Sequence, residues 1–169
     1  MGTNEKRRRA LYRESIILVI GLFVIGAGLY SYFSTSTEAA LLRAAFVNGS
    51  VQTATLKLKV VESEVDRRKG LMYERQMPLD RGMLFVFKTD AVQSFWMKDT
   101  LIPLDMIFLD KDMKVVGMLE NVPVLNTEPR RVESPSRYVL EVNGGVGSKL
   151  GVKTGSVLKI LAGSLSGYH

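Results

Sequence analysis

The stretch that decides the fold is Gly82-Met83-Leu84-Phe85-Val86-Phe87, which is followed by a mostly apolar run from Phe95 to Asp105. Because residues 83–87 are apolar at every position, they predict a strand that is covered on both faces. Residues 92–98 and 104–109 are predicted to form two more strands, since aromatic and branched apolar side chains dominate both. The centre of the chain is therefore expected to be a β sheet.

Further strands are expected on both sides of this centre. Apolar and polar residues alternate along residues 53–61, and similar short runs predict strands over residues 114–119, 137–142 and 157–161. Residues 66–77 lack this alternation and stop before a proline, which predicts a short helix or helical turn. About seven short strands without a strand–helix–strand rhythm predict a mainly β fold, a small antiparallel barrel or sandwich with one or two short helices.

The N-terminal segment has the character of a membrane anchor. Residues 15–37 carry no charge, and about 20 apolar residues suffice to cross a bilayer as a helix. Residues 1–14 hold five basic and two acidic side chains, which places the N-terminus in the cytoplasm and the C-terminal domain outside it. We expect residues 15–33 to form a single transmembrane helix in the lipid bilayer of the cytoplasmic membrane. The alternative is a signal peptide whose cleavage gives a secreted protein, although no clean Ala-x-Ala site follows the run.

The remaining boundaries follow from composition. Residues 1–14 form a basic cytoplasmic tail, and residues 34–50 are expected to be a linker in which residues 38–47 suit a short helix. The β-rich domain is expected over residues 51–162, followed by a flexible tail over residues 163–169.

Composition excludes several classes of function. The formal net charge of +6 is divided equally between residues 1–14 and the rest, and no stripe of basic residues interleaved with aromatics is present, so nucleic acid is not expected as a partner. The chain has no cysteine, and its single histidine is the last residue, His169. We therefore expect no disulfide, no metal site and no cofactor.

Several motifs resemble the family called domain of unknown function 192. They are Lys69-Gly70-Leu71-Met72-Tyr73, Phe95-Trp96-Met97-Lys98, Pro103-Leu104-Asp105 and the run from Tyr138 to Gly145. The resemblance covers roughly residues 56–160 and implies a compact, barrel-like β domain, often behind a signal peptide or anchor. It implies no established reaction. The chain departs from the family pattern where Asp99 replaces a usual Asn, Glu74 a usual basic residue and Ser156 a usual Asp.

Asp105 is the sharpest candidate for chemistry. On the predicted strand 104–109 it shares a face with Ile107 and Leu109, and burial disfavours a charged carboxylate unless a cation or amide groups compensate. Such perturbed groups gather at functional sites. The competing interpretation is structural, with the carboxylate paired to Lys98 or accepting backbone N–H groups at the turn 100–103.

Other polar residues complete a candidate site. Two carboxylates about 5 to 9 Å apart can carry out glycoside hydrolysis, so the candidate catalytic residues are Asp105, Glu141 and Asp99. Trp96 shares one side of its predicted strand with Lys98 and can stack on a sugar ring, unless its ring belongs to the core. The basic run of residues 67–69 is expected to be a solvated face. The candidate ligand-binding residues are Trp96, Lys98, Asp105, Glu141 and Asn143.

Three functions remain open from the sequence. The first is a membrane-anchored, non-enzymatic module that binds a carbohydrate or an envelope protein. The second is a carboxylate-based hydrolase acting on carbohydrate or cell-envelope polymer, and the third is a structural component of an envelope complex.

Overall fold

The computed structural model describes residues 24–25 and 41–166. The chain divides into two compact units, residues 1–40 and residues 41–169, and the first is described only at residues 24–25, which are helical. The predicted tail 1–14 and nearly all of the predicted anchor 15–33 therefore lie outside the described residues. Within the described ranges, no helix combines the length and apolar character that crossing a membrane requires.

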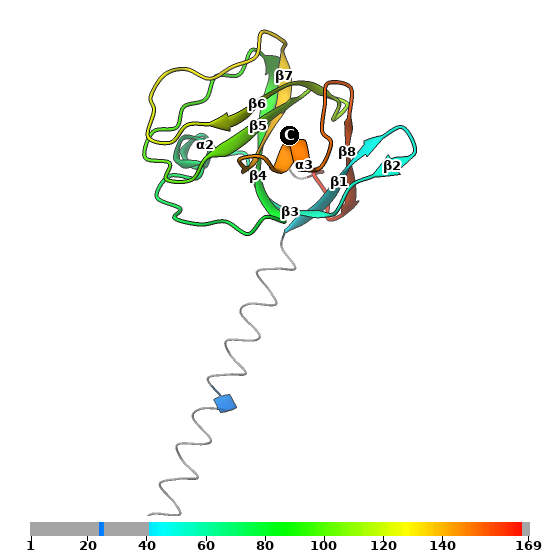
Figure 1. The fold of residues 1–169 in the computed structure, drawn as a ribbon, viewed down its shortest axis with the longest axis horizontal. Coiled ribbons are helices and arrows are strands. Elements are labelled where there is room, and N and C mark those ends of the chain that lie inside the picture. The colour runs from blue at the N-terminus through cyan, green and yellow to red at the C-terminus, as the bar shows by residue number, and fades with distance from the viewer. Residues whose placement is uncertain (1–23, 26–40, 167–169) are drawn as a thin grey trace, which may run out of the picture. The chain divides into compact units, whose positions relative to one another are not determined.

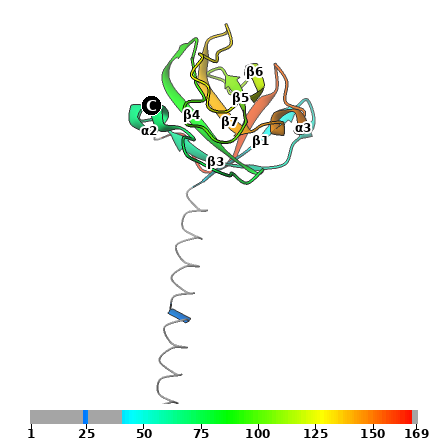
Figure 2. The same cartoon turned by 60° about the vertical axis from the view of Figure 1, so that its left-hand side comes forward.

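The second unit is built on one eight-stranded sheet that curls into a half-barrel (Figure 1). Along the sheet the order is β2-β1-β3-β4-β7-β5-β6, and β8 pairs with the free edge of β1. Two short helices, α2 and α3, lie on opposite sides of the sheet (Figure 2). The element bounds are β1 Leu42–Asn48, β2 Val51–Gln52, β3 Leu56–Val61, α2 Glu64–Lys69, β4 Arg81–Ala91, β5 Leu104–Leu109, β6 Val115–Val122, β7 Ser136–Asn143, α3 Val146–Lys149 and β8 Val157–Ala162.

The prediction of a mainly β fold with short helices is confirmed, but the sheet is not antiparallel throughout, as was expected of a barrel or sandwich. Strands β3 and β4 run parallel, with Lys57 beside Arg81 and Val61 beside Phe85. A tight hairpin cannot connect parallel neighbours, so residues 62–80 cross over between them and carry α2.

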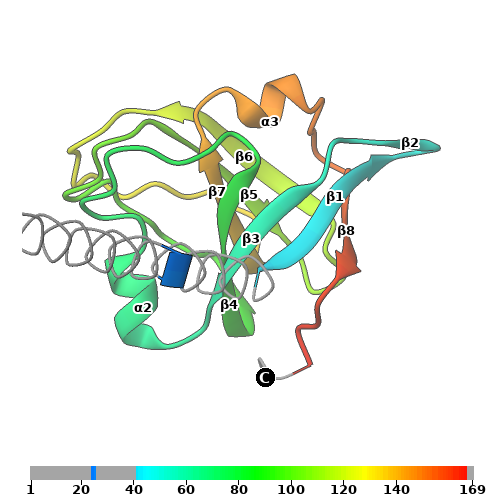
Figure 3. The same cartoon turned by 90° about the horizontal axis from the view of Figure 1, so that it is seen from below.

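The two ends of the curl meet at one corner, where β6 begins and β8 begins (Figure 3). Lys114 and Val157 form an isolated antiparallel bridge. The N–H of Val115 donates to the carbonyl of Ser156 (2.8 Å), and the N–H of Leu158 donates to the carbonyl of Met113 (2.9 Å). These bonds hold the half-barrel in its curl without a continuous ladder between β6 and β8.

The sheet has a core on each face of its central strands. The first core cluster includes Leu84 and Ile107 and extends to β1, β3 and β8, which places it inside the curl. The second cluster includes Phe85 and Met106, whose side chains point to the opposite face of the same strands. As a result β5 is buried at all six positions, and the predicted strand at residues 83–87 is indeed covered on both faces.

The expected helix over residues 38–47 is wrong in its described part. Residues 42–48 form β1, which is held between β3 and β8, and Ala44, Ala45 and Phe46 are fully buried. Pairing on both edges overrides the local helical character of an Ala-rich segment. The sheet thus begins before the predicted domain start at residue 51.

The predicted strand over residues 92–98 is also wrong. Phe95 makes an isolated bridge with Arg130, and the rest of the segment is irregular. The predicted helix over residues 66–77 is shorter than expected, because α2 ends before Gly70, whose φ is +48°.

Candidate functional site

Helix α2 forms one wall of a pocket on the outer face of the sheet. The hydroxyl of Ser63 caps the helix by accepting the N–H of Asp66 (3.1 Å). Arg67 joins the helix to β4, because its guanidinium donates to the carbonyl of Val86 (3.2 Å) and lies 4.9 Å from the centre of the Phe87 ring. These contacts fix α2 over the middle of β4.

The irregular segment at residues 94–98 forms the opposite wall. Phe95 and Arg130 exchange two backbone hydrogen bonds (2.8 and 2.7 Å), and Met97 is fully buried. Successive side chains therefore alternate as they would in a strand, and Trp96 and Lys98 point outward. Trp96 is 46% exposed, and the Lys98 ammonium lies 5.7 Å from the centre of its ring.

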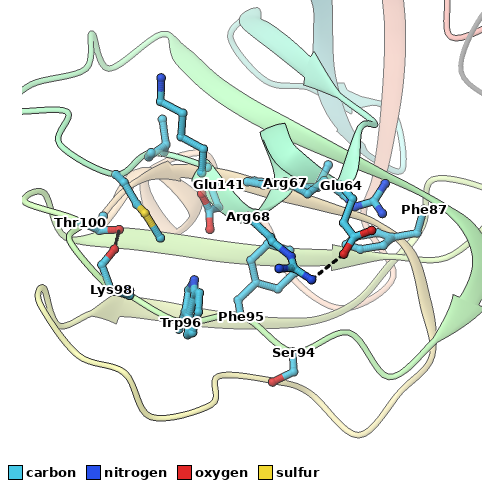
Figure 4. Close-up of a pocket in the computed structure, with 15 residues that line it drawn as sticks. Glu64, Arg67, Arg68, Phe87, Ser94, Phe95, Trp96, Lys98, Thr100 and Glu141 are labelled. Atoms are coloured by element: carbon cyan, nitrogen blue, oxygen red, sulfur yellow. Dashed lines mark hydrogen bonds and ion pairs between the residues drawn. The ribbon is translucent and has the colours of Figure 1, made fainter.

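A pocket of about 350 Å³ lies between these walls (Figure 4). This volume falls at the lower end of the range for small-molecule sites, roughly 300 to 1,000 Å³. Figure 4 shows Glu141, from β7, among the side chains that line it, together with Arg68 of α2 and Trp96. The lining combines aromatic rings with charged groups.

Glu141 is the unusual member of this lining. It is only 4% exposed, and no hydrogen bond or ion pair to its side chain occurs among the residues that the structure describes. Burial raises the pKa of Glu141 from 4.5 to about 8 because the charged form loses its hydration. At neutral pH the group is therefore a protonated carboxyl, which offers one O–H donor and one acceptor to whatever enters the pocket.

Asp105 lies on the other face of the sheet. In the register of β5 with β7, Asp105 stands beside Val142 and Met106 beside Glu141, and directly paired residues share a face. The carboxylate accepts the N–H groups of Asn121 (2.8 Å), Gly145 (2.9 Å) and Gly147 (2.8 Å). Asp105 thus holds the turn into α3 and stays remote from the pocket side of the sheet.

The glycine-rich turn is shaped around this carboxylate. A Cβ on Gly147 would lie 3.1 Å from the Asp105 Oδ2 atom and 2.7 Å from the Met118 sulfur. Gly145 has a φ of +80°, which favours glycine. The glycines of this turn therefore allow its backbone to pack closely against the Asp105 carboxylate.

Asp99 and Asn143 support the surrounding loops and do not line the pocket. The Asp99 carboxylate accepts the hydroxyl of Tyr73 (3.1 Å). The Asn143 side-chain amide donates to the carbonyls of Met77 (2.9 Å) and Pro78 (3.3 Å). The structure thus brings Trp96, Lys98 and Glu141 together and leaves Asp105, Asp99 and Asn143 outside this group.

Sequence reasoning missed the contribution of α2. Arg68 and Lys69 line the pocket together with Thr100, whereas the basic run was expected to be an ordinary solvated face. The signal available was the position of this run directly before the Lys69–Tyr73 motif. Within residues 24–25 and 41–166, no group of three or more acidic, His or Cys side chains is placed to hold a metal ion.

Comparison with known proteins agrees with the fold. The family model DUF192, described as "Uncharacterized ACR", matches residues 46–160. The chain belongs to the DUF192 family. The match covers β3 to β7 and both short helices, so it includes both walls of the pocket and Glu141.

Two solved structures resemble this DUF192 chain. One is a protein of unknown function from Novosphingobium aromaticivorans, with a TM-score of 0.67, 28% identity and coverage of 70% of this chain and 84% of that one. The other, from Sinorhizobium meliloti, is named as a proposed transcription regulator, with a TM-score of 0.69, 35% identity and coverage of 73% and 95%. No curated protein matches the chain.

Proposed function

We propose that this DUF192 chain is a non-enzymatic binding module that takes a carbohydrate into the pocket above Glu141. The Glu141 carboxyl, which is 4% exposed, lines the pocket and has no hydrogen-bond partner among the described residues, is the observation that carries the proposal. Its O–H donor and its acceptor are therefore both available to a ligand. A sugar hydroxyl can satisfy both.

Trp96 supplies the second element of recognition. Its half-exposed ring lines the same pocket as Glu141 and offers a flat apolar surface to the C–H face of a pyranose. The combination of a flat ring with a hydrogen-bonding carboxyl suits a sugar better than a purely apolar ligand.

The geometry favours binding over hydrolysis. Acid–base hydrolysis of a glycoside needs two carboxyl groups at one substrate, and Asp105 lies on the opposite face from Glu141. Glu64 is the other carboxylate among the described lining residues. Its side chain is 70% exposed and forms an ion pair with Arg68 (2.6 Å), so it is not held over the pocket floor.

Calorimetry on the full-length chain with a panel of neutral and acidic hexoses and their short oligomers tests the proposal. We expect Trp96→Ala and Glu141→Leu, which removes both the donor and the acceptor, each to weaken binding about tenfold or more. Matched controls are Leu125→Ala and Glu133→Leu, since both residues are exposed and neither lines the pocket; we expect both to bind as the parent does. Absence of binding across the panel, or turnover of a bound oligomer, contradicts the proposal. A stable co-purifying protein in place of ligand binding favours an envelope-complex component.

We further propose that residues 15–33 anchor the module in the cytoplasmic membrane, with the domain outside. The uncharged run and the basic residues that precede it support this orientation. Protease treatment of intact spheroplasts, followed by N-terminal sequencing of the membrane fraction, tests it. A processed N-terminus indicates secretion, and full-length chain in the soluble fraction contradicts anchoring.

A further inference from the structure

Two lysines at the pocket have no carboxylate partner among the described residues, and this narrows the class of sugar that the pocket suits. The ionisable groups lining the pocket are Glu64, Arg67, Arg68, Lys69, Lys98 and Glu141. Arg67 donates to backbone carbonyls and covers the Phe87 ring, and Arg68 is paired with Glu64. Neither the Lys69 nor the Lys98 ammonium forms an ion pair with any described residue, and both side chains are exposed.

The carboxylates nearby do not neutralise these lysines. Asp99 directly follows Lys98 in the chain, but its carboxylate is turned to the hydroxyl of Tyr73. Glu141 is protonated at neutral pH, because burial raises its pKa to about 8. The pocket therefore presents a net positive charge around a neutral, hydrogen-bonding floor.

The contact that Lys98 does make is weak enough for a ligand to replace. Its ammonium lies 5.7 Å from the centre of the Trp96 ring, and a cation–π contact at an exposed site is weak. A carboxylate offers the same ammonium a charge-assisted hydrogen bond, which is stronger than a bond between neutral groups. An anionic group close to Trp96 therefore draws the ammonium toward itself.

We propose that the ligand is an acidic sugar, a uronic acid whose carboxylate is bound by Lys98 and Lys69 while its ring lies against Trp96 and a hydroxyl meets Glu141. This inference rests on the proposed carbohydrate binding and adds the anionic group. A neutral sugar would leave both ammonium groups without a counter-ion.

Matched sugars test the inference on the full-length chain. By calorimetry at pH 7, we expect glucuronate and galacturonate to bind at least about fivefold more tightly than glucose and galactose, with the difference shrinking at high salt. Lys98→Gln should abolish most of this preference, with Lys69→Gln acting in the same direction. Lys149→Gln is the control, because this exposed lysine lies on α3, away from the pocket.

The outcomes separate the two proposals. Equal binding of acidic and neutral sugars that still depends on Glu141 overturns the acidic-sugar inference and leaves carbohydrate binding standing. An acidic preference that survives the double Lys69→Gln and Lys98→Gln variant also overturns the inference. Absence of binding by any of the four sugars overturns both.

Discussion

Asp105 and Glu141 lie on opposite faces of the sheet, although their strands are hydrogen-bonded neighbours and their positions differ by a single step in the register. Asp105 is surrounded by three backbone N–H donors, whereas Glu141 faces the pocket without a hydrogen-bond partner in the part of the chain that the structure describes. Two buried carboxyl groups in adjacent strands thus have unrelated roles, one in the packing of a turn and one in a candidate site. Their variants should therefore behave differently.

Asp105→Ala should destabilise the fold strongly. The change leaves the N–H groups of Asn121, Gly145 and Gly147 without an acceptor, and we expect the free energy of unfolding in urea to fall by about 4 kcal/mol. Asp105→Asn keeps one acceptor oxygen, so a loss of about 2 kcal/mol is expected. Unchanged stability in Asp105→Asn together with loss of sugar binding would show that the carboxylate serves the ligand.

Glu141 should make the free energy of unfolding decrease as the pH rises. Between pH 4.5 and about 8 the folded chain retains a proton at Glu141 that the unfolded chain releases, so stability decreases as pH rises through this window. The decrease attributable to this group is on the order of 5 kcal/mol at full titration. Urea unfolding at a series of pH values measures it.

Glu141→Gln removes this titration. Because glutamine is neutral at every pH, the variant should lose less stability than the parent from pH 5 to 9 and should be the more stable of the two above pH 8. Glu133→Gln, on the exposed surface, serves as the control and should follow the parent. Identical pH profiles for Glu141→Gln and the parent would show that Glu141 is ionised and solvated in the folded state.

Tyr73 should ionise at a higher pH than an ordinary tyrosine. The pKa of Tyr73 is raised above 10.0 because its hydroxyl donates to the Asp99 carboxylate, whose negative charge also opposes formation of the phenolate. Ultraviolet difference titration of the parent against Tyr73→Phe isolates this group. Asp99→Asn should move the titration to lower pH, since the amide carries no charge, and an unmoved titration would show that the pair does not form in solution.

Gly82→Ala should cost more than the same change at another strand glycine. A Cβ on Gly82 would lie 2.7 Å from the Glu141 carbonyl oxygen, part of the rigid backbone of β7, and we expect a loss of about 2 to 3 kcal/mol in unfolding free energy. At Gly117 the nearest atoms belong to the half-buried side chain of Val132 (2.8 Å), which lies in a loop and can move. Comparable losses for the two variants would contradict this explanation.

Local sequence patterns predicted the strands whose apolar residues alone indicate which faces are buried. Alternation or continuous apolar character located β3, β4, β5, β7 and β8 to within a few residues. Even where residues 94–98 are irregular, the expected alternation held, since Met97 is buried and Trp96 and Lys98 point outward. Side-chain direction was predictable there although the hydrogen bonding was not.

Properties that depend on distant partners could not be predicted. Asp105 and Glu141 face opposite sides of the sheet because of the register in which β5 pairs with β7. The sequence of neither strand alone determines that register. The parallel pairing of β3 with β4 depends on the path of the crossover, and β1 has an Ala-rich sequence that becomes a strand only between β3 and β8. The pocket could not be predicted from the sequence, because no local pattern indicates that α2 and the residues after it lie over the outer face of the sheet.

The pairing of β1 with β8 also constrains when the domain can fold. Phe46, fully buried, is paired with Leu158 in the sheet. Of the described strands, β1 is synthesised first and β8 last, so the second edge of β1 cannot be paired until β8 has been made. Contacts so far apart in the chain slow folding, because a long loop must close before they form. During synthesis the apolar residues of β1 are therefore exposed for as long as translation lasts, which makes this strand a natural binding site for a chaperone until the C-terminal segment arrives.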